Sequence, residues 1–437
     1  MLDHFSQNHS QMSKKPDNEG GTISLLVDRA EVEKLLEQTL NIWKDCPNSF
    51  PVFNRKYSWM QKRKNESELD KFIESLSVDS CNNNYIPGET TNLEKYFLPI
   101  KNFLVKRLDF CEEGVSLLFS NKFLSVTSKF IKAVKEFDGN ISSAEIFQAC
   151  RNVWTMNWIQ MLFGLKVELT PSVFAYSMLY PYTDNFLDSP DIPDERKKVF
   201  NQRLMERLCG NQIEPIEKIE SVVYQLLDMI ETEFPRYDYP AVFNSLITIH
   251  EAQIKSLQLA DKDVLLSHED RLKISLEKGG TSVLADGYLV AGDLSDAQKL
   301  FLFSYGGYLQ LVDDLQDVND DSLFGVKTYF TAKISTENLD VITNHICHFG
   351  RKIILLLKAL EPEQIDIITS LMDRTNDLLI IDAVALCPGC YGRRYLKSIA
   401  KHSVFNNTFL KLRGKEFIDS AFNFMDKQPI LSNDQGS

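Results

Sequence analysis

Two short segments of this 437-residue chain concentrate carboxylates at helical spacing. In the first, Asp184 and Asp188 are four residues apart, so a helix would carry both on one face. The two carboxylates repel each other there, and Pro190 indicates that they stand in the last turn, where the helix dipole also disfavours anions. Because a divalent cation would reverse both penalties, we expect this segment to belong to a site.

The second segment places Asp313, Asp317 and Asp321 at positions i, i+4 and i+8, with Asp314 and Asp320 beside them. Left unpaired, such a row of like charges along one helical stripe is unfavourable. The chain immediately before it is almost wholly apolar, so the row emerges from a helix that we expect to be buried. A solvated acidic face is the alternative interpretation, and the segment alone leaves it open.

Carboxylate oxygens are hard ligands, which select Mg²⁺, or alternatively Mn²⁺, over zinc. Mg²⁺ in proteins is commonly held by a few carboxylates while phosphate oxygens of the substrate complete its coordination. Since the two segments lie on separate helices, we expect them to face each other and to grip one diphosphate through metal ions. The expected metal ligands are Asp184, Asp188, Asp313, Asp314, Asp317 and Asp321.

The elements that must position these segments are helices throughout, because apolar residues recur with helical periodicity and no series of alternating strands is found. The sequence therefore predicts an all-α fold, a single large helical bundle over residues 91–427. Residues 25–90 are expected to form an N-terminal helical elaboration, least regular over 46–90, with tails at 1–24 and 428–437. Helices are predicted over 28–45, 91–109, 113–137, 142–165, 171–188, 194–209, 213–233, 240–260, 267–290, 295–320, 335–360, 363–386, 390–402 and 412–426.

Composition narrows the class of protein. The chain has 48 basic and 61 acidic residues, a formal charge of −13, which argues against a general nucleic-acid binder. Its 28 Phe and 15 Tyr suit either a large core or the lining of an apolar cavity. No run of 18 uncharged apolar residues occurs, so no transmembrane segment is predicted.

The chain start and the cysteines bear on location. The first 22 residues are polar and lack the apolar region of a signal peptide, so a disordered lead is expected. The eight cysteines show no spacing framework, which favours reduced thiols and a cytoplasmic protein. Cys387 and Cys390 flank Pro388-Gly389. For this pair a helix-ending turn is favoured over a redox or zinc site.

At these acidic segments the sequence resembles the class I isoprenoid (terpenoid) synthase superfamily. Asp184-Asn185-Phe186-Leu187-Asp188 resembles its first D-D-x-x-D motif with Asn in place of the second Asp, and Asp313-Asp314-Leu315-Gln316-Asp317 matches its second. The resemblance covers roughly residues 90–425. It implies a Mg²⁺-dependent lyase of isoprenoid biosynthesis that ionises a linear prenyl diphosphate, cyclises or rearranges the carbocation and releases diphosphate.

Two departures locate the chain within that superfamily. The first motif is not followed by the Arg-Arg-Gly of elongating synthases, and no Arg stands between the acids of the second motif as in squalene or phytoene synthases. The terpene-cyclase branch near the squalene-synthase-like enzymes therefore suits it best. A coupling or elongating prenyltransferase and a non-catalytic subunit with the same fold remain the alternatives, and homodimerisation is left open.

The resemblance also implies supporting residues. Arg394-Tyr395 is similar to a diphosphate-sensing pair of bacterial cyclases, although a basic helix surface explains it equally well. Lys278, Gln310 and Lys327 are implied in substrate binding. The implied catalytic set is Asp184, Asp188, Asp313, Asp317, Arg394 and Tyr395. Aromatic residues at helical spacing that either line the cavity or fill the core are Trp154, Trp158, Phe174, Tyr176, Phe301 and Tyr305.

Overall fold

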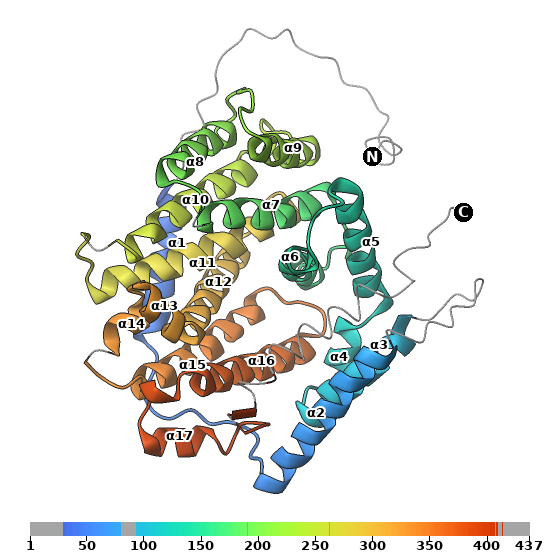
Figure 1. The fold of residues 1–437 in the computed structure, drawn as a ribbon, viewed down its shortest axis with the longest axis vertical. Coiled ribbons are helices and arrows are strands. Elements are labelled where there is room, and N and C mark those ends of the chain that lie inside the picture. The colour runs from blue at the N-terminus through green and yellow to red at the C-terminus, as the bar shows by residue number, and fades with distance from the viewer. Residues whose placement is uncertain are drawn as a thin grey trace.

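The computed structural model describes residues 29–79, 93–189, 191–261, 263–334, 336–406, 408–409 and 413. Within these residues all regular structure is helical and no strand occurs, which confirms the all-α prediction (Figure 1). The α-helices are α1 (Arg29–Lys44), α2 (Trp59–Asp79), α3 (Leu93–Arg107), α4 (Glu112–Leu118), α5 (Asn121–Phe137), α6 (Ser143–Leu162), α7 (Pro171–Asp188), α8 (Asp194–Leu208), α9 (Lys218–Glu233), α10 (Pro240–Ser256), α11 (His268–Ala291), α12 (Asp296–Gln316), α13 (Val318–Phe324), α14 (Tyr329–Lys333), α15 (Asp340–Leu355), α16 (Ile365–Leu386) and α17 (Arg393–Ile399).

Helices α11 and α12 lie side by side at the centre of the molecule (Figure 1). Their backbones approach closely where Gly279 meets Gly306, because a Cβ atom on either glycine would collide with the carbonyl oxygen of the other. Both helices begin with a capping box, at Ser267 and Ser295, which satisfies the first free backbone N–H groups. These glycines do not break either helix. They allow α12 to pack directly against α11.

The other long helices surround this central pair. Helices α6, α7 and α10 lie on one side of it and α15 and α16 on the other, with α8 and α9 beyond α7 and α10 (Figure 1). Helix α1 packs on α11, α12 and α15, and its Trp43 is buried in edge-to-face contact with Phe349 at a centroid distance of 5.2 Å. The first helix of the 25–90 region is thus part of the main core.

Most predicted helices are found, with differences that have local causes. The predicted helix 113–137 is divided into α4 and α5 at Ser120, which caps the second half with extended backbone. Helix α2 was missed, because its first half is strongly polar and its buried apolar residues begin only at Leu69. The predicted helix 412–426 and both predicted tails lie outside the described residues, apart from residue 413.

The sulfur chemistry differs from the expectation of reduced thiols at one place. Residues 388–390 form a 3-10 turn after α16, as the Pro-Gly pair predicts, and Cys387 and Cys390 are joined by a disulfide. Separately, none of the described helices combines the length and apolar character needed to cross a membrane.

Candidate active site

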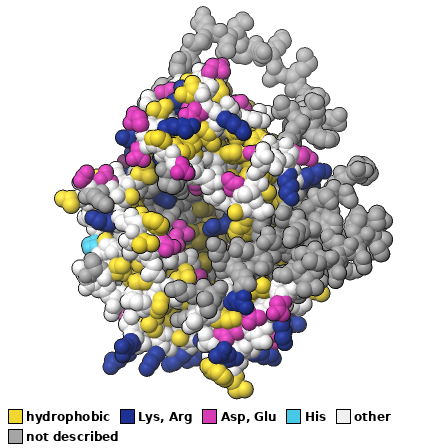
Figure 2. Space-filling view, in the orientation of Figure 1, with side chains coloured by type: hydrophobic (Ala, Val, Ile, Leu, Met, Phe, Trp, Pro, Cys, Tyr) yellow, Lys and Arg dark blue, Asp and Glu magenta, His cyan; other side chains and the backbone are white. Residues whose placement is uncertain are grey.

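A cavity of about 710 Å³ lies among α6, α7, α10, α11, α12 and α16. Its volume falls within the range of roughly 300–1,000 Å³ that is usual for small-molecule sites. The space-filling view shows this face of the molecule hollowed near its middle, with acidic side chains at the rim (Figure 2). The cavity is therefore large enough for an organic substrate and open to solvent.

Both acidic segments reach this one cavity. Asp184 on α7 and Asp313 on α12 belong to its lining, together with Lys278 on α11 and Gln310 on α12. The sequence predicted these four residues for one site, and the packing of three separate helices brings them to the same space. The side chain of Asp188 lies outside the described part of the structure.

The second acidic segment spans a junction between two helices. Helix α12 ends at Gln316, and Asp317 separates it from α13, yet the backbone N–H of Asp317 donates to Asp313 O at 2.9 Å and that of Asp321 to Asp317 O at 2.8 Å. These bonds keep the helical i, i+4, i+8 relation through the junction. Asp313 and Asp317 are exposed, whereas Asp321 is half-buried.

Asp314 is the buried member of this segment. Its carboxylate accepts hydrogen bonds from Ser275 Oγ at 2.6 Å and from Gln310 Nε2 at 2.8 Å. Burial raises the pKa of Asp314 to about 6 despite these two donors, which act in the opposite direction. Gln310 therefore positions Asp314 from a place in the cavity lining.

The carboxylates of this segment are close enough to affect one another. Burial and then the charges of Asp314, Asp317 and Asp313 raise the pKa of Asp321 to about 7, and Lys278 acts in the opposite direction. Burial and the charge of Asp313 likewise raise the pKa of Asp317. Repulsion of this kind is what a bound cation relieves.

The first acidic segment has a different local setting. Asp184 is half-buried and lies within 3.4 Å of Thr183 Oγ1. Asn185, which stands where the family motif has its second Asp, is exposed, and its amide donates to Glu145 Oε1 on α6 at 3.0 Å. Asn185 does not belong to the cavity lining, so this departure from the motif falls outside the site.

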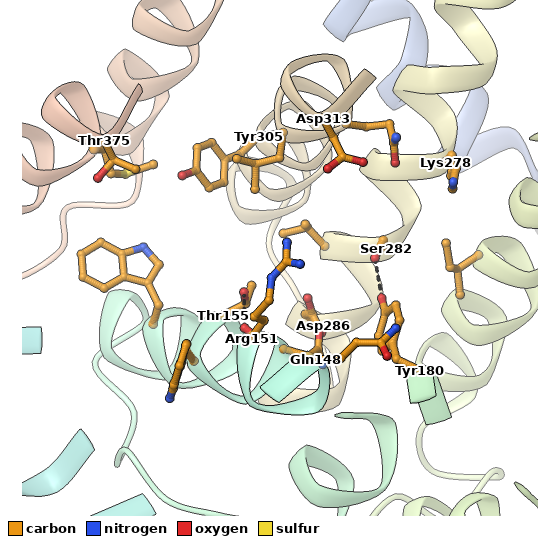
Figure 3. Close-up of a pocket in the computed structure, with 18 of the residues that line it drawn as sticks. Gln148, Arg151, Thr155, Tyr180, Lys278, Ser282, Asp286, Tyr305, Asp313 and Thr375 are labelled. Atoms are coloured by element: carbon orange, nitrogen blue, oxygen red, sulfur yellow. Dashed lines mark hydrogen bonds between the residues drawn. The ribbon is translucent and has the colours of Figure 1, made fainter. Parts of the chain in front are cut away.

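Arg151 is a cation of the site that the sequence reasoning missed. It lines the cavity and extends from α6 toward the wall that carries Asp313 (Figure 3). Among the described residues no carboxylate pairs with Arg151 or with Lys278, so both can donate to an anionic ligand. The sequence could have pointed to Arg151, because it is the only charged residue between Glu145 and Lys166.

The wall next to Arg151 holds a buried acid, Asp286. This side chain is only 1% exposed, lines the cavity near Tyr180 and Ser282 (Figure 3), and has one carboxyl oxygen without a hydrogen-bond partner. Burial raises the pKa of Asp286 well above its ordinary value, which favours the protonated form in the folded protein. Tyr180 and Ser282 share a hydrogen bond of 2.7 Å.

Three of the six aromatic residues that the sequence offered as cavity lining belong to it. Trp154, Trp158 and Tyr305 line the cavity, and Trp154 Nε1 donates to Thr127 Oγ1 at 3.0 Å. Phe174 and Phe301, by contrast, are buried in the main core and do not line it. Tyr176 is also buried in that core and lines a smaller neighbouring pocket.

Three residues implied by the resemblance lie away from the cavity lining. Arg394 is exposed on α17, and Tyr395 is buried there, donating to Asn344 Oδ1 at 3.0 Å. Lys327 is exposed and uses its backbone, whose N–H donates to Leu259 O at 2.7 Å. Helix α17 packs on α16, and neither Arg394 nor Tyr395 belongs to the cavity lining.

The residues present fit Mg²⁺ by the chemistry of their donors. All are carboxylate oxygens, and Mg²⁺ needs only one or two of them when substrate phosphates supply other ligands. Within the described part of the chain, no three carboxylate, imidazole or thiolate groups converge into a ready-made metal site. Binding of Mg²⁺ or Mn²⁺ therefore stays a prediction.

Comparison of the chain with models of known families, with curated proteins and with solved structures finds no match.

Proposed function

We propose that this protein is a Mg²⁺-dependent class I terpene synthase that ionises a linear prenyl diphosphate and converts the carbocation to a cyclic or rearranged terpene. One observation carries the proposal. Asp184 and Asp313, from segments far apart in the sequence, line one cavity that also contains unpaired cations and indole rings. Such a cavity suits a ligand with an anionic head and an apolar body.

The anionic head would be held by carboxylates, acting through Mg²⁺, and by cationic side chains that contact it directly. Asp184 and the carboxylates around Asp313 would hold Mg²⁺, which when bound withdraws charge from a diphosphate leaving group. Lys278 and Arg151 would donate N–H groups to diphosphate oxygens and stabilise the charge that develops as the C–O bond breaks. Gln310 would keep Asp314 in place through its 2.8 Å hydrogen bond.

The apolar body would lie against the aromatic walls. Trp154, Trp158 and Tyr305 present ring systems to the cavity. The face of an aromatic ring attracts a cation by about 0.5–2 kcal/mol, which would stabilise positive charge as it moves along the chain. No acid–base triad is needed for ionisation, and the proposal requires none.

The test is incubation of the purified protein with prenyl diphosphates of increasing chain length and Mg²⁺, with measurement of released diphosphate and of organic-extractable products. A cyclase forms both from one prenyl diphosphate alone, and chelation of the metal by EDTA abolishes both. Strict dependence on isopentenyl diphosphate would instead identify an elongating prenyltransferase. Absence of turnover with every substrate, together with absence of metal-dependent diphosphate binding, would leave the non-catalytic subunit.

A variant pair connects activity to the cavity. Arg151→Gln removes the charge that extends into the cavity, whereas Lys198→Gln makes the same change on the exposed surface of α8. We expect a loss of turnover in the first variant and not in the second. Equal activity of both variants would remove Arg151 from the proposed diphosphate site.

A further inference from the structure

Two segments of this acidic chain carry only positive charge. Residues 52–64 contain Arg55, Lys56, Lys62, Arg63 and Lys64 and no Asp or Glu. Residues 391–402 contain Arg393, Arg394, Lys397 and Lys401, again without an acid. The two segments together hold nine cations and no acid in a protein whose formal charge is −13.

The fold joins these two segments into one face, which we call the basic face. The backbone N–H of Tyr57 donates to Lys401 O at 2.7 Å, and Lys62 Nζ donates to Ala400 O. The ring of His402 bonds to the carbonyl oxygen of Arg55. The start of α2 and the end of α17 are therefore held together, and Figure 2 shows Lys and Arg side chains gathered along the lower edge where these helices lie.

Most cations of the basic face are free to act outward. Lys56, Lys64, Arg393, Arg394, Lys397 and Lys401 are exposed and have no carboxylate partner in the described part of the chain. Arg55 and Arg63 have only loose partners, at 3.8 Å from Asp109 and 3.5 Å from Glu66. Intramolecular ion pairs do not explain this concentration of charge.

Large apolar side chains protrude among these cations. Trp59 is 66% exposed, Met60 76% and Val52 76%. The guanidinium of Arg63 lies over the Trp59 ring, 5.5 Å from its centroid. Figure 2 shows hydrophobic side chains at the lowest point of the molecule, between basic ones. Exposed Trp and aliphatic groups ringed by Lys and Arg are the composition of surfaces that insert into a lipid interface.

We propose that the basic face docks the protein peripherally on an anionic lipid bilayer. The cations would meet anionic headgroups, and Trp59, Met60 and Val52 would enter the boundary between headgroups and acyl chains. A nucleic acid would also attract the cations, but burial of Met60 and Val52 gains free energy only in an apolar surrounding, which a lipid interface offers and a phosphate backbone does not. This proposal does not depend on the reaction proposed for the cavity.

The experiment is co-sedimentation of the full chain with vesicles of phosphatidylcholine alone or mixed with phosphatidylglycerol, at low and high salt. We expect binding to the anionic vesicles only, and weakening by salt. Each cation near such a surface contributes roughly a fivefold factor. A variant with Lys56, Arg393, Lys397 and Lys401 all changed to Gln should therefore lose about a hundredfold or more in binding.

A matched variant removes the same charge elsewhere. Lys122, Lys129, Lys132 and Lys198 are exposed on α5 and α8, far from the basic face, and their change to Gln should leave most vesicle binding intact. A second variant, Trp59→Ser with Met60→Ser, tests insertion without altering charge. It should weaken vesicle binding, and bromine-labelled acyl chains should quench the fluorescence of the parent protein more than that of Trp59→Phe.

Three results would overturn the proposal. The first is binding to neutral vesicles as tight as to anionic ones, or no binding to either. The second is an equal loss of vesicle binding in the two fourfold Gln variants, the one on the basic face and the one on α5 and α8. The third is binding of a synthetic oligonucleotide as tight as that of anionic vesicles, unaffected by the Trp59→Ser, Met60→Ser change. That last result would assign the basic face to a nucleic acid.

Discussion

Replacing Asp313 with Asn distinguishes a metal ligand from a solvated acidic face. If Asp313 holds metal, turnover should fall by roughly a hundredfold or more, since even the groups that only support a ligand are worth 10–100-fold. The melting temperature without ligand should be unchanged or slightly higher, because the substitution relieves repulsion with Asp317 and Asp321. Steady-state kinetics and thermal unfolding of the same preparation measure both effects.

Glu363→Gln is the control for this variant, since Glu363 is exposed and precedes α16, away from the cavity. It should change neither quantity. Turnover of Asp313→Asn near that of the parent protein would contradict the metal assignment. A lower melting temperature accompanied by lost turnover would show that Asp313 acts through folding.

Asp286 gives a prediction for pH. Its pKa in the folded protein is raised by burial, whereas in the unfolded chain an Asp titrates near 3.9. The folded state therefore holds the proton more strongly, so the contribution of Asp286 to stability is fully present below about pH 4 and declines as the pH rises. Asn does not ionise, so Asp286→Asn avoids this decline. The melting temperature of the variant minus that of the parent protein should therefore be on the order of 1–3 °C higher at pH 8 than at pH 4.

Melting curves of Asp286→Asn and the parent protein across this pH range provide the measurement. The exposed Asp238→Asn, with the same chemical change, is the control. A difference in melting temperature that is constant from pH 4 to pH 8 would mean that burial does not raise the pKa of Asp286.

At the scale of elements, the site depends on how closely α11 and α12 pack. Gly279→Ala would place a Cβ against the carbonyl oxygen of Gly306 and force the two helices apart. We expect a loss of roughly 1–3 kcal/mol in the free energy of unfolding. Activity should fall as well, because Lys278 and Gln310 lie on the two helices at this crossing.

Gly139→Ala is the matched control, since its Cβ would come no closer than 3.8 Å to another atom and its φ is not positive. Chemical denaturation should show it unchanged or slightly more stable than the parent protein. Equal stability of the two alanine variants would mean that the helix crossing can relax around the added carbon.

At the scale of the whole molecule, Mg²⁺ and diphosphate should bind together between the acidic segment on α7 and the one at the end of α12. Mg²⁺ together with inorganic diphosphate should raise the melting temperature more than either alone, because the metal and the anion complete each other's ligands between α7 and α12. EDTA should abolish the effect. Diphosphate that stabilises equally well in EDTA would show binding by Lys278 and Arg151 without metal.

The sequence alone predicted the class of fold and most of the helices. Helix α7 illustrates why, because Thr170 caps it, Pro171 opens it and Asp188 ends it at the residues that local propensity indicates. Such signals lie within a few residues of one another and need no tertiary information. The acidic segments were identified in the same way, since the spacing of Asp184 and of Asp313, Asp317 and Asp321 is a local property of a helix.

The tertiary structure alone decided which residues share the cavity. Arg151 and Asp286 enter it because α6 and α11 pack with those faces inward, whereas Arg394 and Tyr395 belong to a helix, α17, that lies away from it. A helical period defines a face but not the partner toward which that face turns. That choice depends on contacts between residues far apart in the chain, such as Gly279 with Gly306, and on the burial that they produce.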